Sequence, residues 1–499
     1  MTPEKSLPGP QRRTKFVIIG AGISGILMAI KLRERGFEDI VVLEKGDALG
    51  GTWRENRYPG AACDVAAHLY VYSFAPNPAW RSRYAKAPDI WKYYHDVARR
   101  HGVLPHIRYG QQVASATWLG DKWALMTEQG DSYQADVVIA ACGRLHHPVM
   151  PPIAGAESFA GPLFHTSRWD PALDIRDKHV GVIGTGSTAT QIVASSAAQV
   201  ARLSMFQRTA QWVYPLPDTP VPWWRRLLFH VSPTAGRRYY YTLRSQTEER
   251  GKAATGDGPA REARDQVCFD ALASLRDPAL RAKLTPDYAV GCKRLVFSGD
   301  YYQAVQHPSV DLVSDPIDHI EPRGVVTKDG TLHELDVLAF ATGFDAHAYL
   351  RPMQVTGEDG ARLDEVWRDL PLTYRSMAIP HMPNFLMLNG PYSPGGTASV
   401  VGIVEAQAAY LLLLIDRIVR DHVAITPNDA ASRSWLDEVR QRASASVWAT
   451  GGCQSWYLDK TGTPTLDPST LSELEAQLAR VNWDDFTVRQ REPVATAVD

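Results

Sequence analysis

Two glycine-rich turns are the segments of this sequence whose residue types and spacing could do chemistry. The first turn reads GAGISG at positions 20–25, between an apolar, β-branched run at 16–19 and a stretch of helical composition at 26–32. A GxGxxG turn between a strand and a helix brings the N–H groups at the helix start close to a pyrophosphate. We therefore predict a dinucleotide site here. Its expected contact residues are Gly20, Gly22, Ser24 and Gly25.

The next strand indicates which dinucleotide this first site takes. A second apolar run, Ile40–Leu43, ends at Glu44, about 20 residues after the last glycine of the turn. A carboxylate in this place accepts hydrogen bonds from both ribose hydroxyls and repels a 2′-phosphate. The first site therefore suits FAD or NAD and not NADP.

The chain repeats this arrangement once, with a different ending. The apolar run 179–183 leads into GTGSTA at 184–189, and the strand that follows ends at Arg208 and Thr209 instead of an acid. A guanidinium and a hydroxyl are the groups that a 2′-phosphate needs. We therefore predict an NADPH site. Its expected contact residues are Gly184, Thr185, Gly186, Ser187, Thr188, Ala189, Arg208 and Thr209.

Two sites with opposite phosphate preferences indicate two cofactors, a held FAD and an exchanging NADPH. Such a pair is typical of a two-step redox enzyme, in which a hydride reaches the flavin and the flavin then reacts with another molecule. A flavoprotein disulfide reductase would need two nearby cysteines after the first fold, and Cys63 stands there alone. Oxygen activation and simple diaphorase activity are the reactions left.

The five cysteines are scattered, and they show neither a CxxC pair nor a metal-ligand spacing. The sequence also starts without the apolar core of a signal peptide. We therefore expect no metal site and a reduced, cytoplasmic protein with free thiols.

The segment before the second turn carries a family signature. Its fixed positions follow the pattern FxGxxxHxxxW(P/D) and are Phe159, Gly161, His165, Trp169 and Asp170. In this pattern the sequence resembles the type I Baeyer–Villiger monooxygenases. The resemblance implies NADPH- and O2-dependent conversion of a ketone to an ester or lactone through a C4a-peroxyflavin. It also implies that the signature lies in the linker between two domains and sets how the NADPH domain moves.

Further segments resemble the same family and imply roles for single residues. Arg294, in a GCKR loop, would supply positive charge to the reacting oxygens, and Asp64 would hold that arginine in place. Lys293 and Trp456 would contact NADPH. The flavin would be contacted by Lys45, Gly51, Thr52, Trp53, Asp64, Tyr70 and Gly390. The flavin-side loop departs from the family at Ala62, where the best-known members carry Arg.

The elements that must position these residues form an α/β protein with two Rossmann-like dinucleotide-binding domains. We expect an FAD domain at 1–155 and 345–499, and an NADPH domain at 156–217 and 291–344. The stretch 218–290 breaks the strand–helix rhythm of the second domain and predicts a helical subdomain that walls the substrate pocket. We also expect an antiparallel excursion near Trp123 and Tyr133 in the FAD domain.

The bulk properties fit a globular enzyme of several domains. Of 499 residues, 44% are apolar and 22% charged, and the net charge of −2 points to neither a nucleic-acid nor a membrane partner. We expect a small ketone and O2 as partners, in a monomer or homodimer. The alternatives are a flavin-containing monooxygenase that oxidises sulfur or nitrogen, an oxidase or diaphorase, and an inactive redox-sensing flavoprotein. The identity of the ketone stays open.

Overall fold

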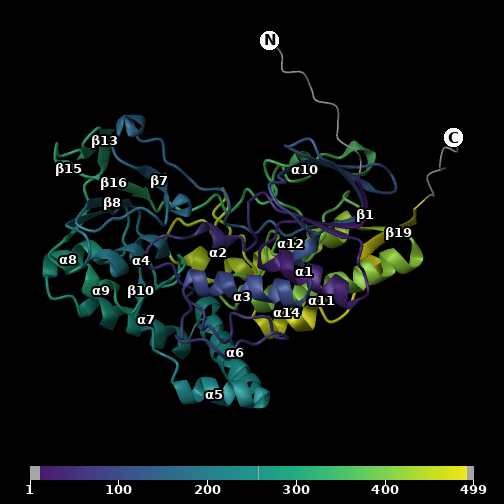
Figure 1. Cartoon of the computed structure of the whole chain (residues 1–499), viewed down its shortest axis with the longest axis horizontal. Coiled ribbons are helices and arrows are strands. Elements are labelled where there is room, and N and C mark those ends of the chain that lie inside the picture. Colours follow the sequence, from purple (N-terminus) through teal and green to yellow (C-terminus); the bar gives the residue numbers. More distant parts are fainter. Residues whose placement is uncertain (1–11, 257, 492–499) are drawn as a thin grey trace, which may run out of the picture.

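The computed structural model describes residues 12–256 and 258–491. The outermost parts of the expected FAD-binding ranges, 1–11 and 492–499, lie outside the described residues. Two sheets lie at opposite ends of the molecule, and helices project below the space between them (Figure 1). This arrangement confirms the α/β fold class with parallel strands at both dinucleotide turns.

The larger sheet carries the first glycine turn and has the order β17-β4-β5-β6-β1-β2-β3, with β18 beside β6. Its strands are β1 (Arg12–Ile19), β2 (Ile40–Leu43), β3 (Ile107–Arg108), β4 (Val113–Trp118), β5 (Trp123–Thr127), β6 (Ser132–Ala140), β17 (Gln354–Thr356) and β18 (Phe385–Met387). The strands β1, β2, β6 and β18 are parallel neighbours, whereas β5 runs antiparallel to both β4 and β6. The expected antiparallel excursion is therefore confirmed.

The centre of this sheet is apolar because helices cover it. Phe16, Val17 and Ile18 of β1 are completely buried, which is typical of a parallel strand covered on both faces. Helices from distant parts of the chain share one core with this sheet. The helices of this half are α1 (Ile23–Glu34), α2 (Thr52–Glu55), α3 (Ala87–Arg100), α10 (Leu363–Val366), α11 (Val400–Asp421), α12 (Asp429–Ser444) and α14 (Leu471–Gln477). Helix α13 (Val447–Thr450) instead packs into the core of the second sheet. Strand β19 (Val423–Pro427), which follows α11, pairs antiparallel with β20 (Phe486–Gln490) near the end of the described chain.

The second sheet carries the second glycine turn and is parallel throughout, in the order β12-β9-β8-β16-β7. Its strands are β7 (Leu163–His165), β8 (His179–Ile183), β9 (Arg202–Phe206), β12 (Val310–Val313) and β16 (Val337–Phe340), with helices α4 (Ser187–Ser196) and α9 (Tyr301–Ala304). Two further strand groups lie beside it, the pair β10 (Val213–Tyr214) and β11 (Val296–Phe297), and the antiparallel β13 (Ile317–Glu321), β14 (Gly324–Thr327) and β15 (Leu332–Glu334). The antiparallel group is an addition that the sequence did not lead us to expect.

Helices fill the stretch 218–290, as its composition predicted. They are α5 (Trp223–Val231), α6 (Pro233–Thr255), α7 (Pro259–Ala273) and α8 (Pro278–Leu284). Cys268 and Leu272 of α7 belong to the core of the second sheet, whereas α5 lies at the far tip of the projection (Figure 1). Short 3-10 turns complete the structure at Leu104–His106, Ala156–Ser158, Thr166–Arg168, Glu358–Gly360 and Trp483–Asp485. Among the described residues, no helix is long and apolar enough to cross a membrane.

Candidate active site

The first glycine turn joins β1 to α1 and leaves the start of α1 open to a ligand. Gly20 has a φ of +102°, and a Cβ there would lie 2.8 Å from the carbonyl oxygen of Ala141, so only glycine fits. The helix begins after Gly22 without a side-chain cap and without an acidic residue in its first turn. Its first N–H groups therefore remain available to an anion. Gly51 faces Gly22 across this turn, because a Cβ on Gly22 would lie 3.7 Å from the Cα of Gly51.

Glu44 lies at the carboxyl end of β2, buried, and beside the first turn. One carboxylate oxygen accepts a hydrogen bond from the N–H of Ala21 at 2.7 Å, and the other accepts one from Gly46 at 2.8 Å. These bonds fix the carboxylate while each oxygen keeps acceptor capacity for a ribose hydroxyl. The neighbouring Lys45 is exposed.

The other residues expected at the flavin lie on two loops. Gly51 precedes α2, where Thr52 is exposed and Trp53 is half-buried. The Trp53 indole donates a hydrogen bond to the Tyr70 hydroxyl at 3.1 Å, and burial raises the pKa of that hydroxyl well above its usual range. The loop after β18 contributes Gly390, whose carbonyl oxygen accepts a hydrogen bond from Arg144. The rings of Trp53 and Tyr70 also pack edge to face, with their centroids 5.6 Å apart.

The second glycine turn repeats the geometry of the first. Gly184 has a φ of +126°, and a Cβ there would lie 2.4 Å from the carbonyl oxygen of Ala341. Helix α4 begins after Gly186, again without a side-chain cap or an acid in its first turn, and nothing lies within 4 Å of a Cβ built on Gly186. The Thr185 hydroxyl donates to the carbonyl oxygen of Thr209 at 2.8 Å, which ties the turn to the end of β9. Ser187 and Thr188 are partly buried in the first turn of α4, and Ala189 is fully buried.

Lys293 is acted on by the charges of two residues, Arg208 and Asp287. Burial lowers the pKa of the Lys293 ammonium, and the positive charge of Arg208 lowers it further. Lys293 also lies over the ring of Tyr288, at 4.7 Å from its centroid. Within residues 12–256 and 258–491, no ion pair joins either cation to an acid. Two cations without an ion-pair partner can bind an anion.

Arg294 and Asp64, far apart in sequence, meet between the two turns. A guanidinium nitrogen of Arg294 (Nη2) lies 2.6 Å from an oxygen of Asp64. The charge of Asp64 is the main cause that raises the pKa of Arg294, and the hydroxyl of Tyr457 contributes in the same direction. The Arg294 side chain is 39% exposed and Asp64 is 18% exposed. The arginine is thus a fixed positive charge that still faces open space.

The segment that covers this arginine places Tyr457, and not Trp456, against it. Tyr457 is buried, and burial is the main cause that raises the pKa of its hydroxyl, while Arg294 lowers it. Trp456 is 37% exposed and its ring lies 4.5 Å from that of Tyr457. The two rings therefore form one aromatic unit, with the tryptophan on its outer side.

The expectation of free thiols throughout is wrong. Cys292 and Cys453 form a disulfide between positions separated by 161 residues. The bond joins the loop that carries Arg294 to the segment that carries Tyr457. Sequence spacing could not reveal the pair, because only the folding of the chain brings the two loops together. Cys63, Cys142 and Cys268 remain free.

The linker signature lies where the chain passes between the two sheets. It connects the segment that enters the second sheet with the segment that leaves this sheet after β16. The Nε2 atom of His165 hydrogen-bonds the carbonyl oxygen of Gly343 at 2.9 Å, so Nδ1 accepts from the N–H of Ser167. Trp169 is buried in the core on one face of the second sheet, and Phe159 belongs to the core on the opposite face of that sheet. A Cβ on Gly161 would lie 2.2 Å from the carbonyl oxygen of Asp336, and Asp170 closes a local turn by accepting from Ala172.

Arg144 is the residue at this site that sequence reasoning missed. It is 9% exposed, its Nη2 donates to the carbonyl oxygen of Gly390 at 3.1 Å, and its buried Nε has no partner. Burial lowers the pKa of this guanidinium, whereas the hydroxyls of Tyr349 and Tyr457 raise it. A buried arginine without a carboxylate is costly unless a ligand compensates it. Only the position of Arg144 soon after β6 could have drawn attention to it.

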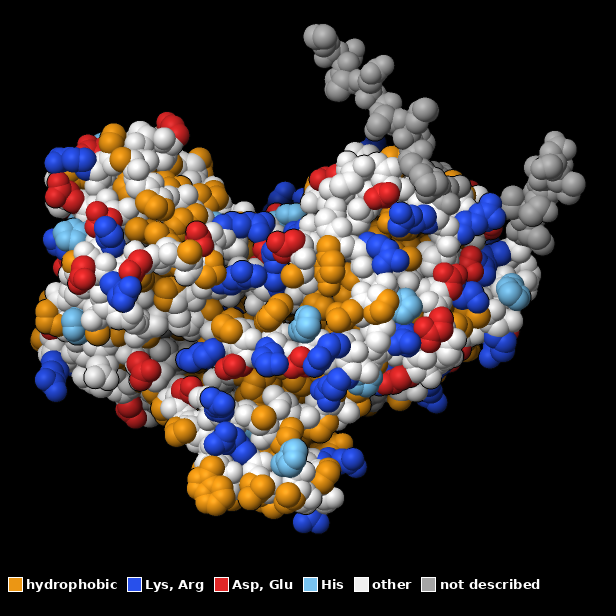
Figure 2. Space-filling model, viewed as in Figure 1, with side chains coloured by type: hydrophobic (Ala, Val, Ile, Leu, Met, Phe, Trp, Pro, Cys, Tyr) orange, Lys and Arg blue, Asp and Glu red, His pale blue; other side chains and the backbone are white. Residues whose placement is uncertain are grey.

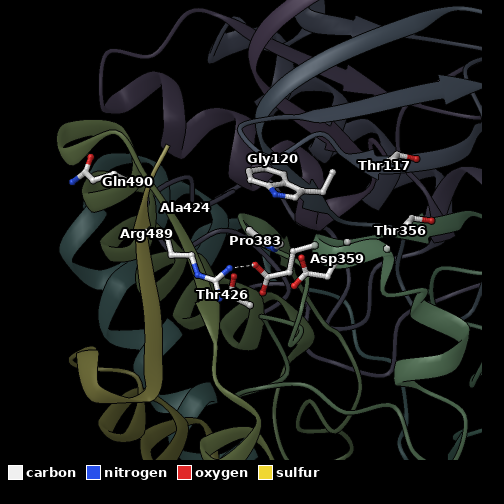
Figure 3. A pocket seen from close by; sticks show the side chains of 13 residues that line it. Thr117, Gly120, Thr356, Asp359, Pro383, Ala424, Thr426, Arg489 and Gln490 are labelled. Carbon is white, nitrogen blue, oxygen red and sulfur yellow. Dashed lines mark hydrogen bonds and ion pairs between the residues drawn. The ribbon is translucent and has the colours of Figure 1, made fainter. Parts of the chain in front are cut away.

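A separate surface cavity of about 380 Å³ lies away from this site. It is bordered by Trp118, by the loop at 356–360 and by the ion pair of Arg489 with Glu358 at 2.8 Å (Figure 3). None of the residues that line it is among the expected cofactor contacts.

Comparison with known proteins agrees with this geometry. A model of the pyridine nucleotide-disulphide oxidoreductase family matches residues 17–224, and the Cys292–Cys453 disulfide lies outside that match. With its two dinucleotide turns, the chain is a flavoprotein oxidoreductase that uses a pyridine nucleotide.

Relatives narrow this class. An uncharacterized monooxygenase of Mycobacterium tuberculosis is 42% identical over 95% of this chain and 96% of that protein. A Baeyer-Villiger monooxygenase of Streptomyces coelicolor is 37% identical, covering 96% of this chain and 93% of that protein. The crystal structure of cyclohexanone monooxygenase from Rhodococcus sp. Phi1, bound to NADP+, matches with a TM-score of 0.87 and 29% identity over 96% of this chain and 100% of that one. The chain belongs to the type I Baeyer–Villiger monooxygenases, as the linker signature predicted, and is an FAD- and NADPH-dependent monooxygenase.

Proposed function

We propose that this enzyme inserts one oxygen atom of O2 beside the carbonyl carbon of a small ketone, giving an ester or lactone. One NADPH and one proton supply the two electrons and two hydrogens, and the second oxygen atom leaves as water. The observation that carries the proposal is the Arg294–Asp64 pair between the two glycine turns, at 2.6 Å. It would supply a fixed positive charge to the oxygen on which negative charge develops during such an insertion.

The two glycine turns divide the cofactors between the sheets. FAD would lie with its pyrophosphate at the start of α1 and its ribose at Glu44. NADPH would lie at the start of α4, with its 2′-phosphate at Arg208, Thr209 and Lys293. The helix starts fit phosphate groups because both lack a cap and an acid. The domain ranges follow, with FAD on 1–155 and 345–499 and NADPH on 156–217 and 291–344.

Bound FAD, once reduced by NADPH, supplies the oxygen-activating chemistry. The protein orients the ketone and stabilises the negative charge that appears on oxygen. Because Asp64 engages one nitrogen of Arg294, the remaining N–H groups of the guanidinium can be directed at the substrate. Arg144 adds a second positive charge nearby, since both arginines act on Tyr457.

Two features keep water out and bring the domains together. Tyr457, with Trp456 on its outer side, lies against Arg294 and shields part of the guanidinium from water, which strengthens its electrostatic effect. His165 joins both chain crossings, so it sets the position of the second sheet relative to the first. We assign it a positioning role.

The test is product analysis after aerobic incubation with NADPH, linear, cyclic and aryl ketones, and one aryl sulfide. Esters or lactones heavier than their ketones by one oxygen are expected. Hydrogen peroxide alone from the whole panel would indicate an oxidase. Sulfoxide without any ester would favour the sulfur- and nitrogen-oxidising alternative and remove Arg294 from its proposed role.

A further inference from the structure

Helix α5 presents its apolar side to solvent instead of to the protein core. Exposed fractions are 69% for Trp223, 51% for Trp224, 53% for Leu227, 40% for Leu228 and 68% for Val231. Since an α-helix turns about 100° per residue, these positions share one face. Figure 2 shows apolar side chains gathered on the projection that α5 forms in Figure 1. We call these residues the α5 outer face.

The opposite side of the helix fixes this orientation. Phe229 is 8% exposed, and its ring lies 5.2 Å from that of His68 and 5.3 Å from that of Tyr239. Tyr239 belongs to α6 and also lies 5.4 Å from His68. The buried phenylalanine therefore holds α5 with its outer face turned away from the protein. A rotation that buried the outer face would expel Phe229 from this cluster.

The surroundings of the outer face are strongly basic. No Asp or Glu occurs between Asp218 and Glu248, whereas the chain as a whole has a net charge of −2. The arginines of this stretch are Arg225, Arg226, Arg237, Arg238 and Arg244. In the described part of the chain, no ion pair joins any of the first four to a carboxylate. The positive charge beside the apolar face is therefore not neutralised by the protein itself.

The arginines on α5 lie at both edges of the outer face. At 100° per residue, Arg226 falls beyond Trp223 on one edge and Arg225 falls beyond Leu228 on the other. The guanidinium of Arg225 lies 5.3 Å from the ring centroid of Trp224. Arg237 and Arg238 follow in the first turns of α6, both exposed. Apolar residues flanked by cations in this way insert among lipid chains while their arginines reach the headgroups.

We propose that the α5 outer face docks this enzyme on an anionic lipid surface. Tryptophan side chains favour the boundary between lipid chains and headgroups, and unpaired arginines favour negatively charged headgroups. A second copy of this chain would bring the same unpaired arginines to the interface, and like charges would repel there. The expectation of no membrane partner rested on the charge of the whole chain, which does not describe this local surface.

The experiment is co-sedimentation of the full chain, with its cofactors, and large unilamellar vesicles. Vesicles of equal parts phosphatidylglycerol and phosphatidylcholine are compared with phosphatidylcholine alone. The protein is expected to pellet with the anionic vesicles only, and added salt should weaken the binding. Absence from the pellet at low ionic strength would overturn the proposal.

Variants separate the apolar and the charged contributions. Leu227→Ser should weaken vesicle binding by about fivefold or more. Leu119→Ser is the matched control, because Leu119 is equally exposed, at 51%, but lies after β4. The double change Arg237→Gln and Arg238→Gln should weaken binding to anionic vesicles by about twentyfold.

The remaining outcomes also decide the matter. Equal losses for Leu227→Ser and Leu119→Ser would contradict a role of the α5 outer face. If size-exclusion chromatography shows a dimer that Leu227→Ser dissociates, and vesicles bind neither form, the face serves a second copy instead. Thermal unfolding of each variant checks that the fold is intact.

Discussion

Substitution of Arg294 is the most direct test of the proposed chemistry. The guanidinium uses Nη2 to hold Asp64 at 2.6 Å and also interacts with the Tyr457 hydroxyl, and the proposed function directs N–H groups that these two contacts leave over at the substrate. A lysine has one nitrogen, so in Arg294→Lys that nitrogen would be engaged by the carboxylate. We therefore expect Arg294→Lys to lose ester formation nearly as fully as Arg294→Gln, although it keeps the charge.

The structure also sets the size of the effect. A fixed donor aimed at developing negative charge contributes about 3–4 kcal/mol in a site closed to water. Because the Arg294 side chain is 39% exposed here, we expect the lower end, about 3 kcal/mol. This corresponds to a loss of about a hundredfold in the rate of ester formation.

The assay follows three quantities in the same reaction, namely NADPH consumed, ester formed and hydrogen peroxide released. In both Arg294 variants, NADPH consumption should continue as peroxide release while ester formation falls. The control is Arg489→Gln, which breaks a pair of similar length with Glu358 far from the site. Ester formation within threefold of the unaltered enzyme in Arg294→Gln would refute the role assigned to this arginine.

Further predictions concern cofactor choice and stability. Arg208→Gln or Lys293→Met should raise KM for NADPH by about tenfold or more while leaving KM for NADH nearly unchanged, since only the 2′-phosphate contact is lost. Cys292→Ser, which breaks the bond to Cys453, should lower the free energy of unfolding in urea by up to about 5 kcal/mol, as loop closure predicts; no difference between oxidised and reduced protein would contradict this. Burial and Arg225 lower the pKa of His68 to about 4. The unfolded chain therefore takes up the proton first, so the free energy of unfolding should fall as the pH drops from about 6.5 to about 4, and less so in His68→Gln.

The sequence predicted those parts of the site that depend on neighbours along the chain. The first turn, its flanking strand and helix, and Glu44 all lie within one continuous stretch, so their spacing in the sequence is enough to predict how they are arranged. The second turn and its flanking strand and helix also lie within one continuous stretch, whereas the contact of Arg208 with a 2′-phosphate stays a prediction. The pairing of Arg294 with Asp64 was expected only through the family resemblance, and its geometry needed the fold.

What the sequence could not predict depends on contacts between distant segments. Cys292 and Cys453 look unrelated at a separation of 161 residues, and Arg144 looks like any arginine in a loop. Tyr457 was not among the expected site residues, yet it is the residue packed against Arg294. The stretch 218–290 was expected to be helical, but its composition did not tell which side of α5 faces the protein.

The pairing of β18 with β6 has a consequence for synthesis on the ribosome. Along one edge of β6, the first half of the strand pairs with β5. The second half, Val138 to Ala140, pairs with β18, which the ribosome synthesises about 250 residues later. The second sheet, by contrast, consists of strands from the intervening stretch 163–340. The middle of the nascent chain can therefore fold before its beginning is complete. Until residues 385–387 emerge, the apolar edge of β6 is open to wrong partners, so slow elongation through the intervening stretch should favour aggregation.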